Sequence, residues 1–453
     1  MNEGNSQVIT GWGRTSPSRT RLIGVQSEDE LRRALARADD RGVIGRGLGR
    51  SYGDAAQNSG GTTIVLSSSD IYVDVATGVV DAAGGASIDS LLQQTIPEGW
   101  FVPVTPGTRF VTVGGAIAAD VHGKNHHRDG SIGHHLVDLT MMVASGEVVV
   151  VDRERDSELF WATIGGMGLT GIILRARLRM IPIETSSVSV RTERHSHLED
   201  LMASMESNDE SYRYAVAWVD GSVGGSRLGR GIVTYGEHAT IDMLPTLRRS
   251  APLDYRSPRV VNVPEFMSRV RPLRRSTAVA FSELWFRKAP KQRVDELVSI
   301  PSYFHTLDGV GKWNRLYGPR GFIQHQCVVP LDAPHAVRAI LERVVRDRPA
   351  NVVNVLKRFG SGNAAPLSFP RPGWTLTVDI PVTDDLVHTL RDIDTIVGEW
   401  GGRHYLAKDA TATSRSIRSG YERLAEWQAV RNRVDPHRVW QSDLGRRLDL
   451  CAG

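Results

Sequence analysis

The chain has 453 residues, 40% of them hydrophobic, and carries 55 Lys and Arg residues against 51 Asp and Glu residues. These proportions are typical of a folded protein with more than one core, and they exclude a disordered chain, a collagen and a small disulfide scaffold. The net charge of +4 is too small for this length to indicate a nucleic-acid-binding protein.

The sequence shows no sign of secretion or of a membrane span. Cys327 and Cys451 are the only cysteines, which is too few for a disulfide framework. Residues 1–21 are polar and lack the apolar centre of a signal peptide. No stretch approaches the roughly 18 apolar residues that a membrane helix needs. We therefore expect a cytoplasmic protein that is at most peripheral to a membrane.

The first predicted element is a helix over residues 27–41. Leu31, Leu35 and Ala38 recur at helical spacing among charged residues, and Ser27 with Glu30 has the pattern of a capping box. A short strand follows, and residues 42–61 are then rich in glycine, which favours close approach of the backbone to a neighbour or a ligand.

Residues 62–179 favour short strands between Gly and Pro turns, with one helix over residues 87–95. Strands are expected at residues 64–66, 79–81, 148–151 and 172–181. Beyond Pro182 the pattern changes to longer strands at residues 188–191 and 213–220 and an amphipathic helix at 333–347. A strand at 374–381 followed by a helix at 385–400 predicts a sheet with helices on one face.

Three glycine-rich blocks lie at residues 46–54, 106–123 and 165–171. The spacing of Gly47, Gly49 and Gly53 and the turn-forming residues after them do not fit a Rossmann fingerprint, and the Gly123-Lys124 pair lacks the rest of a Walker motif. Each block alone is explained by ordinary turns. Together they predict loops that enclose a long ligand with a diphosphate and a flat ring.

At these blocks the sequence resembles the vanillyl-alcohol-oxidase family of FAD enzymes, over nearly the whole chain. Further motifs of the resemblance are TGWGRT at 10–15, WATIGG at 161–166, WNRLYGP at 313–319, APLSFP at 365–370, AKD at 407–409 and DP at 435–436. The resemblance implies a two-domain α+β flavoprotein, in which an antiparallel sheet covered by helices forms the substrate domain. The implied boundaries are residues 1–183 and 403–453 for the FAD-binding domain and 184–402 for the substrate-binding domain.

The resemblance also implies the residues that bind FAD. They are Arg46, Gly47, Leu48, Gly49, Arg50, Ser51, Tyr52, Gly53, Gly107, Thr112, Gly114, Gly115, Ala118, Asp120, His122, Gly123, Gly168, Gly171, Ile172, Tyr405 and Lys408. Many relatives link FAD covalently through a histidine in the first loop. Arg50 stands at that position here, so we expect FAD to be bound without a covalent bond.

Two residues are the candidates for catalysis. Oxidation of a secondary alcohol by hydride transfer needs a base for the hydroxyl proton and positive charge near the reduced ring. His122, with an ordinary pKa of about 6.5, suits a base or a hydrogen-bond partner, and Lys408 suits the positive charge. Without the resemblance, a structural histidine and a solvated lysine are the simpler interpretations.

A metal site is the rival interpretation of the histidine-rich segment. His122, His126, His127, His134 and His135 lie close together in the sequence. Their spacing fits no standard zinc pattern and no cysteine lies nearby, so we expect no metal there.

The substrate pocket that the resemblance implies comprises Tyr52, Tyr317, Gln324, Gln326, Lys357, Thr375 and Thr377. Alternation places Gln324 and Gln326 on one face of a strand, where their amides can hold sugar hydroxyls. The chain departs from the family at His325, where relatives have Tyr, and at Thr375 and Thr377, where the common pattern has Asn and Cys. Inhibitors that react covalently with that cysteine are not expected to react with this chain, because Thr377 has no thiol.

Residues 248–275 form a basic segment with apolar insertions. Its arginines are Arg248, Arg249, Arg256, Arg259, Arg269, Arg271, Arg274 and Arg275. Such a segment could rest on anionic lipid, each basic residue near the surface contributing about 1 kcal/mol. A solvated, mobile loop is the alternative.

The resemblance implies a reaction. FAD would oxidise the 2′-hydroxyl of decaprenylphosphoryl-β-D-ribose to a ketone, the first half of an epimerisation to the arabinose used in cell-wall arabinan. A separate NADH-dependent reductase would complete it, because the chain shows no second dinucleotide motif. The alternatives are an oxidase of a soluble sugar, alditol or aminocyclitol, and a metal- or lipid-binding protein with a decayed flavin fold.

Overall fold

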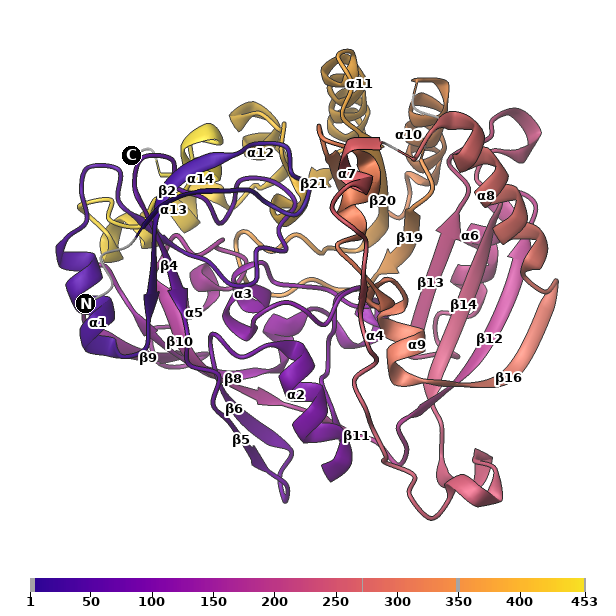
Figure 1. Cartoon of the computed structure of the whole chain (residues 1–453), viewed down its shortest axis with the longest axis horizontal. Helices are drawn as coiled ribbons and strands as arrows, with labels where there is room; N and C mark the ends of the chain where they lie inside the picture. Colours follow the sequence, from indigo (N-terminus) through magenta and orange to yellow (C-terminus); the bar gives the residue numbers. More distant parts are fainter. Residues whose placement is uncertain (1–4, 271, 348–350, 452–453) are drawn as a thin grey trace.

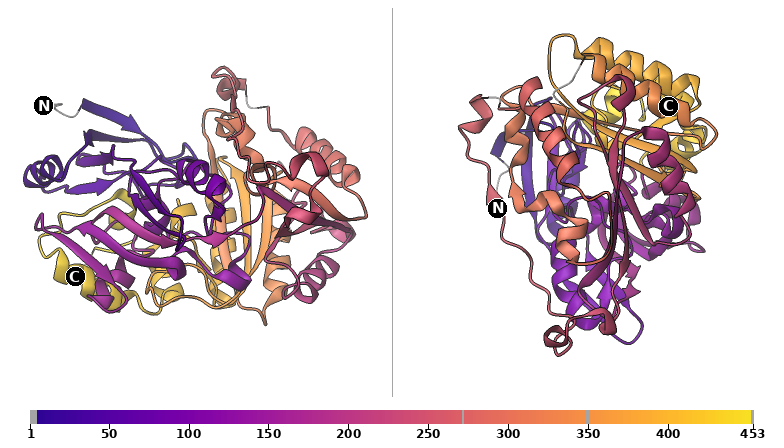
Figure 2. Two further views of the ribbon diagram at one scale, coloured as in Figure 1. Left: turned by 90° about the horizontal axis from the view of Figure 1, so that it is seen from below. Right: turned by 90° about the vertical axis from the view of Figure 1, so that its right-hand side faces the viewer.

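The computed structural model describes residues 5–270, 272–347 and 351–451. Figure 1 shows two parts side by side. The N-terminal and C-terminal segments form one part, and the middle of the chain forms a sheet with helices in the other. Figure 2 shows the same division from two further directions. The α+β fold expected from the sequence is thus confirmed.

Two sheets form the core of the first part. One has the strand order β1 (Asn5–Ile9), β2 (Ser18–Val25), β4 (Thr62–Leu66), β3 (Val43–Gly45). The other has the order β5 (Ile71–Asp74), β6 (Val79–Ala83), β10 (Ile172–Arg179), β8 (Leu136–Met142), β9 (Val148–Asp152). Each of the short strands predicted between residues 62 and 179 falls on one of these.

The capped helix predicted after Ser27 is confirmed as α1 (Glu28–Ala36). The Ser27 hydroxyl accepts from the Glu30 N–H at 3.3 Å, and the Glu30 carboxylate accepts from the Gln26 N–H at 2.7 Å. The cap differs from a capping box in one contact, because the Glu30 side chain accepts from the N–H of the residue before Ser27 and not from that of Ser27 itself.

The expectation of a single helix between residues 62 and 179 is wrong. Besides α2 (Ile88–Thr95), this segment forms α3 (Val113–Ala118), α4 (His126–Asp129) and α5 (Ser157–Thr163). Helix α3 has only six residues, including Gly114 and Gly115, so it shows no amphipathic period that the sequence could reveal. The Thr112 hydroxyl caps it by accepting from the Gly115 N–H at 3.2 Å.

The second part is an eight-stranded sheet. Its strand order is β16 (Gln292–Ser299), β12 (Ser187–His195), β14 (Gly231–His238), β13 (Tyr214–Val219), β19 (Asn354–Phe359), β20 (Gly373–Pro381), β18 (Phe322–Val329), β21 (Arg403–His404). Helices α6 (Leu198–Ser207), α10 (Pro334–Asp347) and α11 (Leu386–Glu399) pack on one face over a shared apolar core, as the strand and helix patterns predicted.

Shorter elements complete the fold. Strands β7 (Trp100–Phe101) and β11 (Ile181–Pro182) pair, as do β15 (Val261–Asn262) and β17 (Val310–Gly311), and the remaining helices of the middle are α7 (Met267–Val270), α8 (Arg275–Lys288) and α9 (Ile300–Phe304). The basic segment thus includes β15 and α7, while Arg271 lies outside the described residues. Among the described helices, none is long and apolar enough to cross a bilayer.

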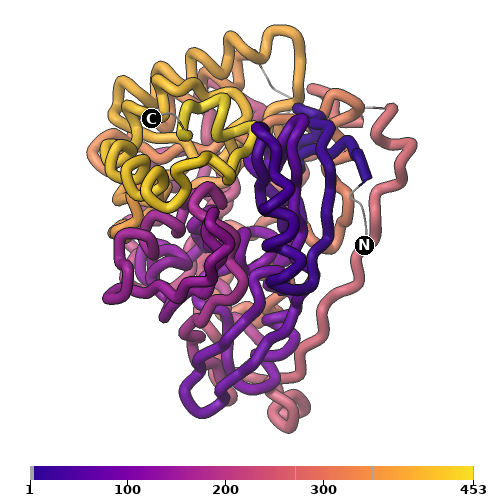
Figure 3. Tube along the Cα trace, turned by 90° about the vertical axis from the view of Figure 1, so that its left-hand side faces the viewer, coloured from indigo at the N-terminus to yellow at the C-terminus, as the bar shows by residue number. Residues whose placement is uncertain are grey.

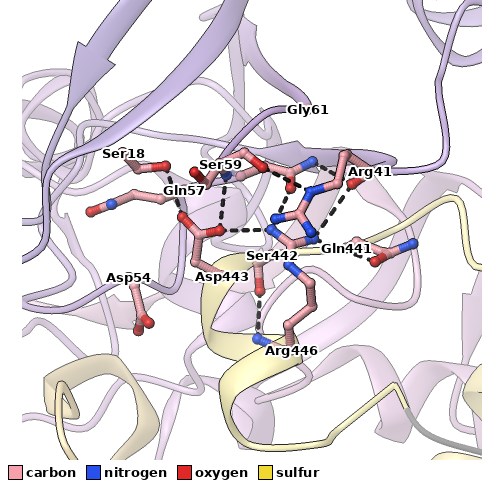
Figure 4. A network of polar contacts seen from close by, with 12 residues as sticks. Ser18, Arg41, Asp54, Gln57, Ser59, Gly61, Gln441, Ser442, Asp443 and Arg446 are labelled. Atoms are coloured by element: carbon pink, nitrogen blue, oxygen red, sulfur yellow. Dashed lines mark hydrogen bonds and ion pairs between the residues drawn. The ribbon is translucent and has the colours of Figure 1, made fainter.

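The chain returns to its first part through β21, the short 3₁₀ turn η8 (Leu406–Lys408), α12 (Ser414–Gly420), α13 (Leu424–Val434) and α14 (Asp443–Arg447). Figure 3 shows this last segment beside the N-terminal strands. Asp443 accepts hydrogen bonds from the Ser18 hydroxyl at 2.8 Å and the Ser59 N–H at 2.9 Å (Figure 4). Arg447 pairs with Asp54 at 2.7 Å and Asp409 at 2.8 Å, which ties α14 to the first glycine block and to the end of η8.

Candidate active site

A cavity of about 470 Å³ lies where the two parts meet. Residues of all three glycine blocks line it, together with residues of β18, β19, β20 and η8. Its lining includes Gly45, Gly47, Gly49, Gly84, Gly85, Gly107, Gly114, Gly115, Gly123, Gly168 and Gly171. A surface with so few side chains lets a ligand approach the backbone itself.

The first glycine block presents backbone N–H groups to this cavity. In the described structure, the five consecutive N–H groups of residues 47–51 donate to no protein acceptor. Arg46 braces the loop, since its guanidinium donates to the Ala56 carbonyl at 2.9 Å and the Thr10 carbonyl at 2.7 Å. Free N–H groups in a row, beside a cation, form a concave site for an anion such as a diphosphate.

The second and third blocks close tightly around the first. A Cβ on Gly47 would lie 2.2 Å from Thr112 Oγ1, and a Cβ on Gly114 would lie 3.1 Å from the Gly84 carbonyl. Gly168 and Gly171 have φ values of 77° and 153°, which favour glycine. The cavity between the blocks therefore fits a long, flat anionic ligand, and the residues present fit FAD.

Arg50 lies at the cavity wall, at the position where relatives carry the histidine that binds flavin covalently. Its guanidinium stacks over Trp12, 4.0 Å from the ring centroid. Burial lowers the pKa of Arg50, and the nearby carboxylate of Asp308 partly offsets this effect. An arginine cannot form the histidyl bond to flavin, so the loop offers packing and charge only.

His122 is buried and its pKa is displaced. Its Nε2 accepts a hydrogen bond from the Gln326 amide at 2.9 Å, which puts the ring proton on Nδ1, and Nδ1 has no hydrogen-bond partner. Burial lowers the pKa of His122 well below its ordinary value, and the charges of Lys357 and Lys408 lower it further. The ordinary pKa given above for His122 thus does not hold in this environment, and its ring is neutral.

Lys408 has a pKa suited to proton transfer. Burial lowers it to about 7, with a further contribution from Lys357 and an opposing one from Asp379. Its ammonium lies 5.5 Å from the centre of the Tyr52 ring, and in the described structure no carboxylate lies within ion-pair distance of it. At neutral pH a substantial fraction of Lys408 is therefore the neutral amine.

Asp379 is a site residue that the sequence interpretation missed. It is buried, accepts from Gln324 at 2.5 Å and from the Tyr317 hydroxyl at 3.0 Å, and burial raises its pKa to about 7. The strand alternation offered a signal, because Thr375 and Thr377 were named and Asp379 is the next residue on that face of β20.

The sequence interpretation also missed Lys124 as a site residue. Lys124 directly follows the second glycine block, and no motif marks it. Its ammonium donates to the Tyr303 carbonyl at 2.5 Å, and burial lowers its pKa to about 7. Burial lowers the pKa of Lys357 to about 8. Lys124, Lys357 and Lys408 all line the same cavity, which therefore favours a ligand that carries negative charge.

The other predicted residues divide into two layers. Tyr52, Gln324, Lys357, Thr377, Tyr405 and Lys408 line the cavity with the glycine blocks, whereas Gly53, Asp120, Tyr317, Gln326 and Thr375 do not. Residues of the second group support the lining: Gln326 bonds to His122, and Tyr317 bonds to Asp379, which in turn accepts from the lining residue Gln324. Asp120 accepts from Ser131 and Ser368 and holds the segment that leads to His122.

The five histidines of the second glycine block and its extension do not gather around a common point. Within the described part of the chain, the only group of three close metal-ligating atoms is formed by His325, Asp394 and His404. That group lies outside the histidine-rich segment.

Comparisons with known proteins agree with this geometry. Residues 20–152 match the FAD binding domain, and residues 381–448 match D-arabinono-1,4-lactone oxidase. The chain is 40% identical to the decaprenylphosphoryl-beta-D-ribose oxidase of Mycolicibacterium smegmatis, over 98% of this chain and 97% of that protein. It is 37% identical to an uncharacterized protein of Streptomyces coelicolor, over 80% of this chain and 100% of that one. Cytokinin dehydrogenase 2 of Arabidopsis thaliana is 29% identical over 30% of this chain and 27% of its own length.

Proposed function

The chain belongs to the decaprenylphosphoryl-β-D-ribose oxidase family of FAD-binding oxidoreductases, and we propose that it oxidises the 2′-hydroxyl of decaprenylphosphoryl-β-D-ribose to the 2′-ketone. The observation that carries the proposal is one cavity that joins a row of free backbone N–H groups to three lysines. The row of N–H groups suits the FAD diphosphate, and the lysines suit an anionic, phosphate-bearing sugar.

In this reaction the alcohol loses a hydride and a proton. Bound FAD supplies the two-electron acceptor for the hydride. The neutral amine of Lys408 accepts the hydroxyl proton at Nζ, and the Asp379 carboxylate offsets the charge that forms. Gln326 holds the neutral ring of His122 at the cavity wall. Lys357, whose pKa of about 8 leaves it mostly protonated at neutral pH, places positive charge for the phosphoryl group.

The absorbance spectrum of the purified protein tests the proposal. We expect a yellow protein whose colour is released by acid precipitation, because Arg50 cannot bind flavin covalently, and is bleached by anaerobic addition of a polyprenyl-phosphoryl ribose. Bleaching by a soluble sugar, alditol or aminocyclitol and not by the lipid-linked ribose would replace the proposed substrate. A protein without flavin would overturn the proposal and favour a binding protein with a decayed flavin fold.

The proposed reaction requires a second step by another enzyme. The 2′-ketone must be reduced to give the arabinose epimer used in cell-wall arabinan, and we propose that a separate NADH-dependent reductase does this. The supporting observation is that the sequence shows no second dinucleotide-binding motif that could hold NADH.

We also propose that the basic segment and α8 rest on the inner face of the plasma membrane, so that the cytoplasmic protein reaches its lipid-linked substrate. Exposed apolar side chains lie among the arginines of α7 and α8, including Phe266 at 61%, Val270 at 55% and Leu284 at 68% exposure. Arg269, Arg274 and Arg275 are exposed beside them. Arginine and large apolar side chains together favour an anionic lipid surface.

Co-sedimentation with vesicles tests this contact. The protein is expected to bind vesicles that contain phosphatidylglycerol and to bind neutral phosphatidylcholine vesicles less. The double variant Phe266→Ser, Arg269→Ser should bind them several-fold more weakly, since it removes one apolar contact and one charge of about 1 kcal/mol. Val8→Ser, which alters an exposed apolar residue of β1, is the matched control. Equal binding by the double variant and the control would contradict the contact.

A further inference from the structure

Two histidines and an aspartate meet behind the active site. His325 lies on β18, His404 on the neighbouring strand β21, and Asp394 on helix α11, which packs over both. Their three ligand atoms lie within 4.8 Å of one another. The cluster therefore joins three elements that are far apart in the sequence.

The separations within the cluster are longer than hydrogen bonds. Asp394 Oδ1 lies 3.5 Å from His325 Nε2 and 3.5 Å from His404 Nε2. N–H···O hydrogen bonds have lengths of about 2.7–3.2 Å. Two ligands of a tetrahedral zinc ion, each about 2.1 Å from the metal, lie about 3.4 Å apart. The observed spacing thus matches the edge of a zinc coordination shell.

The cluster is also closed from solvent and short of partners. His325 and His404 are 7% and 5% exposed, and neither ring nitrogen of His325 has a hydrogen-bond partner. A buried imidazole without a hydrogen-bond partner leaves its nitrogens free for a metal ion.

We propose that His325, His404 and Asp394 bind a Zn²⁺ ion that fastens β21 to α11. Imidazole and carboxylate ligands suit zinc, and three protein ligands leave a position for a fourth. This site is separate from the histidine-rich segment after His122.

The position of the cluster gives the ion a structural role. On β18, Gln324 faces the active-site cavity, whereas His325 points to the opposite face with Ile323 and Cys327, which belong to the core under α10 and α11. Strand β21 ends at His404 and leads directly into η8, which carries Lys408. A metal ion at His404 would therefore hold the start of the segment that places Lys408.

Metal analysis of the flavin-containing protein tests the site. After incubation with Zn²⁺ and gel filtration, we expect one zinc ion per chain, and X-ray absorption at the zinc edge should show two imidazole ligands. His325→Gln and Asp394→Asn should each lose the bound zinc, while His388→Ala, on the exposed side of α11, should retain it. Loss of zinc should also lower the unfolding temperature of the wild-type protein but not that of His325→Gln.

Retained flavin absorbance shows whether each variant is folded, and the X-ray absorption measurement needs no variant at all. Wild-type protein that binds no zinc would overturn the proposal. Zinc that binds equally to wild type and His325→Gln would overturn it as well and would place the ion elsewhere. Neither result depends on the substrate, so failure of the site is distinguishable from failure of the proposed reaction.

Discussion

Lys408→Met is expected to keep FAD bound and to lower kcat by about two to four orders of magnitude, the usual contribution of a positioned acid or base. Methionine has a similar length and fits the apolar side of the cavity, but it has no amine to accept the hydroxyl proton. The measurement is the rate of flavin bleaching after anaerobic mixing with the lipid-linked ribose. A change in KM alone would show that Lys408 binds substrate without taking its proton.

The pH profile separates this role from a structural one. The amine is the base, so wild-type bleaching should slow as the pH falls through about 7, where Lys408 becomes protonated. His122 stays neutral across this range because its pKa is lowered well below the ordinary value. Because burial also brings the pKa values of Asp379 and Lys124 to about 7, this step should be reduced in Lys408→Met and not abolished. Lys291→Met, at an exposed position, should keep both the rate and the step.

The sequence predicted those parts of the fold that depend on local patterns. The cap at Ser27 and the amphipathic period of α10 are local, so the start of α1 and both ends of α10 were predicted, whereas α1 ends at Ala36 and not at residue 41. The glycine-rich helix α3 was not predicted, because six residues with two glycines are too short to show the period that marks a helix. The packing of α14 against the first glycine block rests on contacts such as Asp443 to Ser18, which no local pattern encodes.

The same distinction explains what the sequence revealed of the site. Motifs identified the glycine blocks, and the structure brings these blocks and Lys408 to one cavity. The pKa values of His122 and Lys408 could not be predicted, because both are lowered by burial and by the charge of Lys357, which is distant from each in the sequence. Strand alternation could have identified Asp379, which follows Thr377 on the same face of β20. The position of Lys124 beside Lys357 comes from tertiary packing, which the sequence does not show.

Gly47→Val is expected to yield a folded protein that has lost its FAD. Even a Cβ at this position would lie 2.2 Å from Thr112 Oγ1, and the larger side chain must displace the loop that presents the free N–H groups of residues 47–51. Without that row of donors the diphosphate loses its main partners. The measurement is the ratio of flavin absorbance to protein absorbance after purification.

A matched glycine and a double variant make the test specific. Gly398→Ala, on α11 with open space around its Cβ, should keep the full flavin content. Gly47→Ala should reduce flavin binding less than Gly47→Val, and adding Thr112→Ala should restore part of it, because the clashing hydroxyl is then absent. Restoration must be partial, since Thr112 also caps α3. Full flavin content in Gly47→Val would mean that the first glycine block does not hold the cofactor.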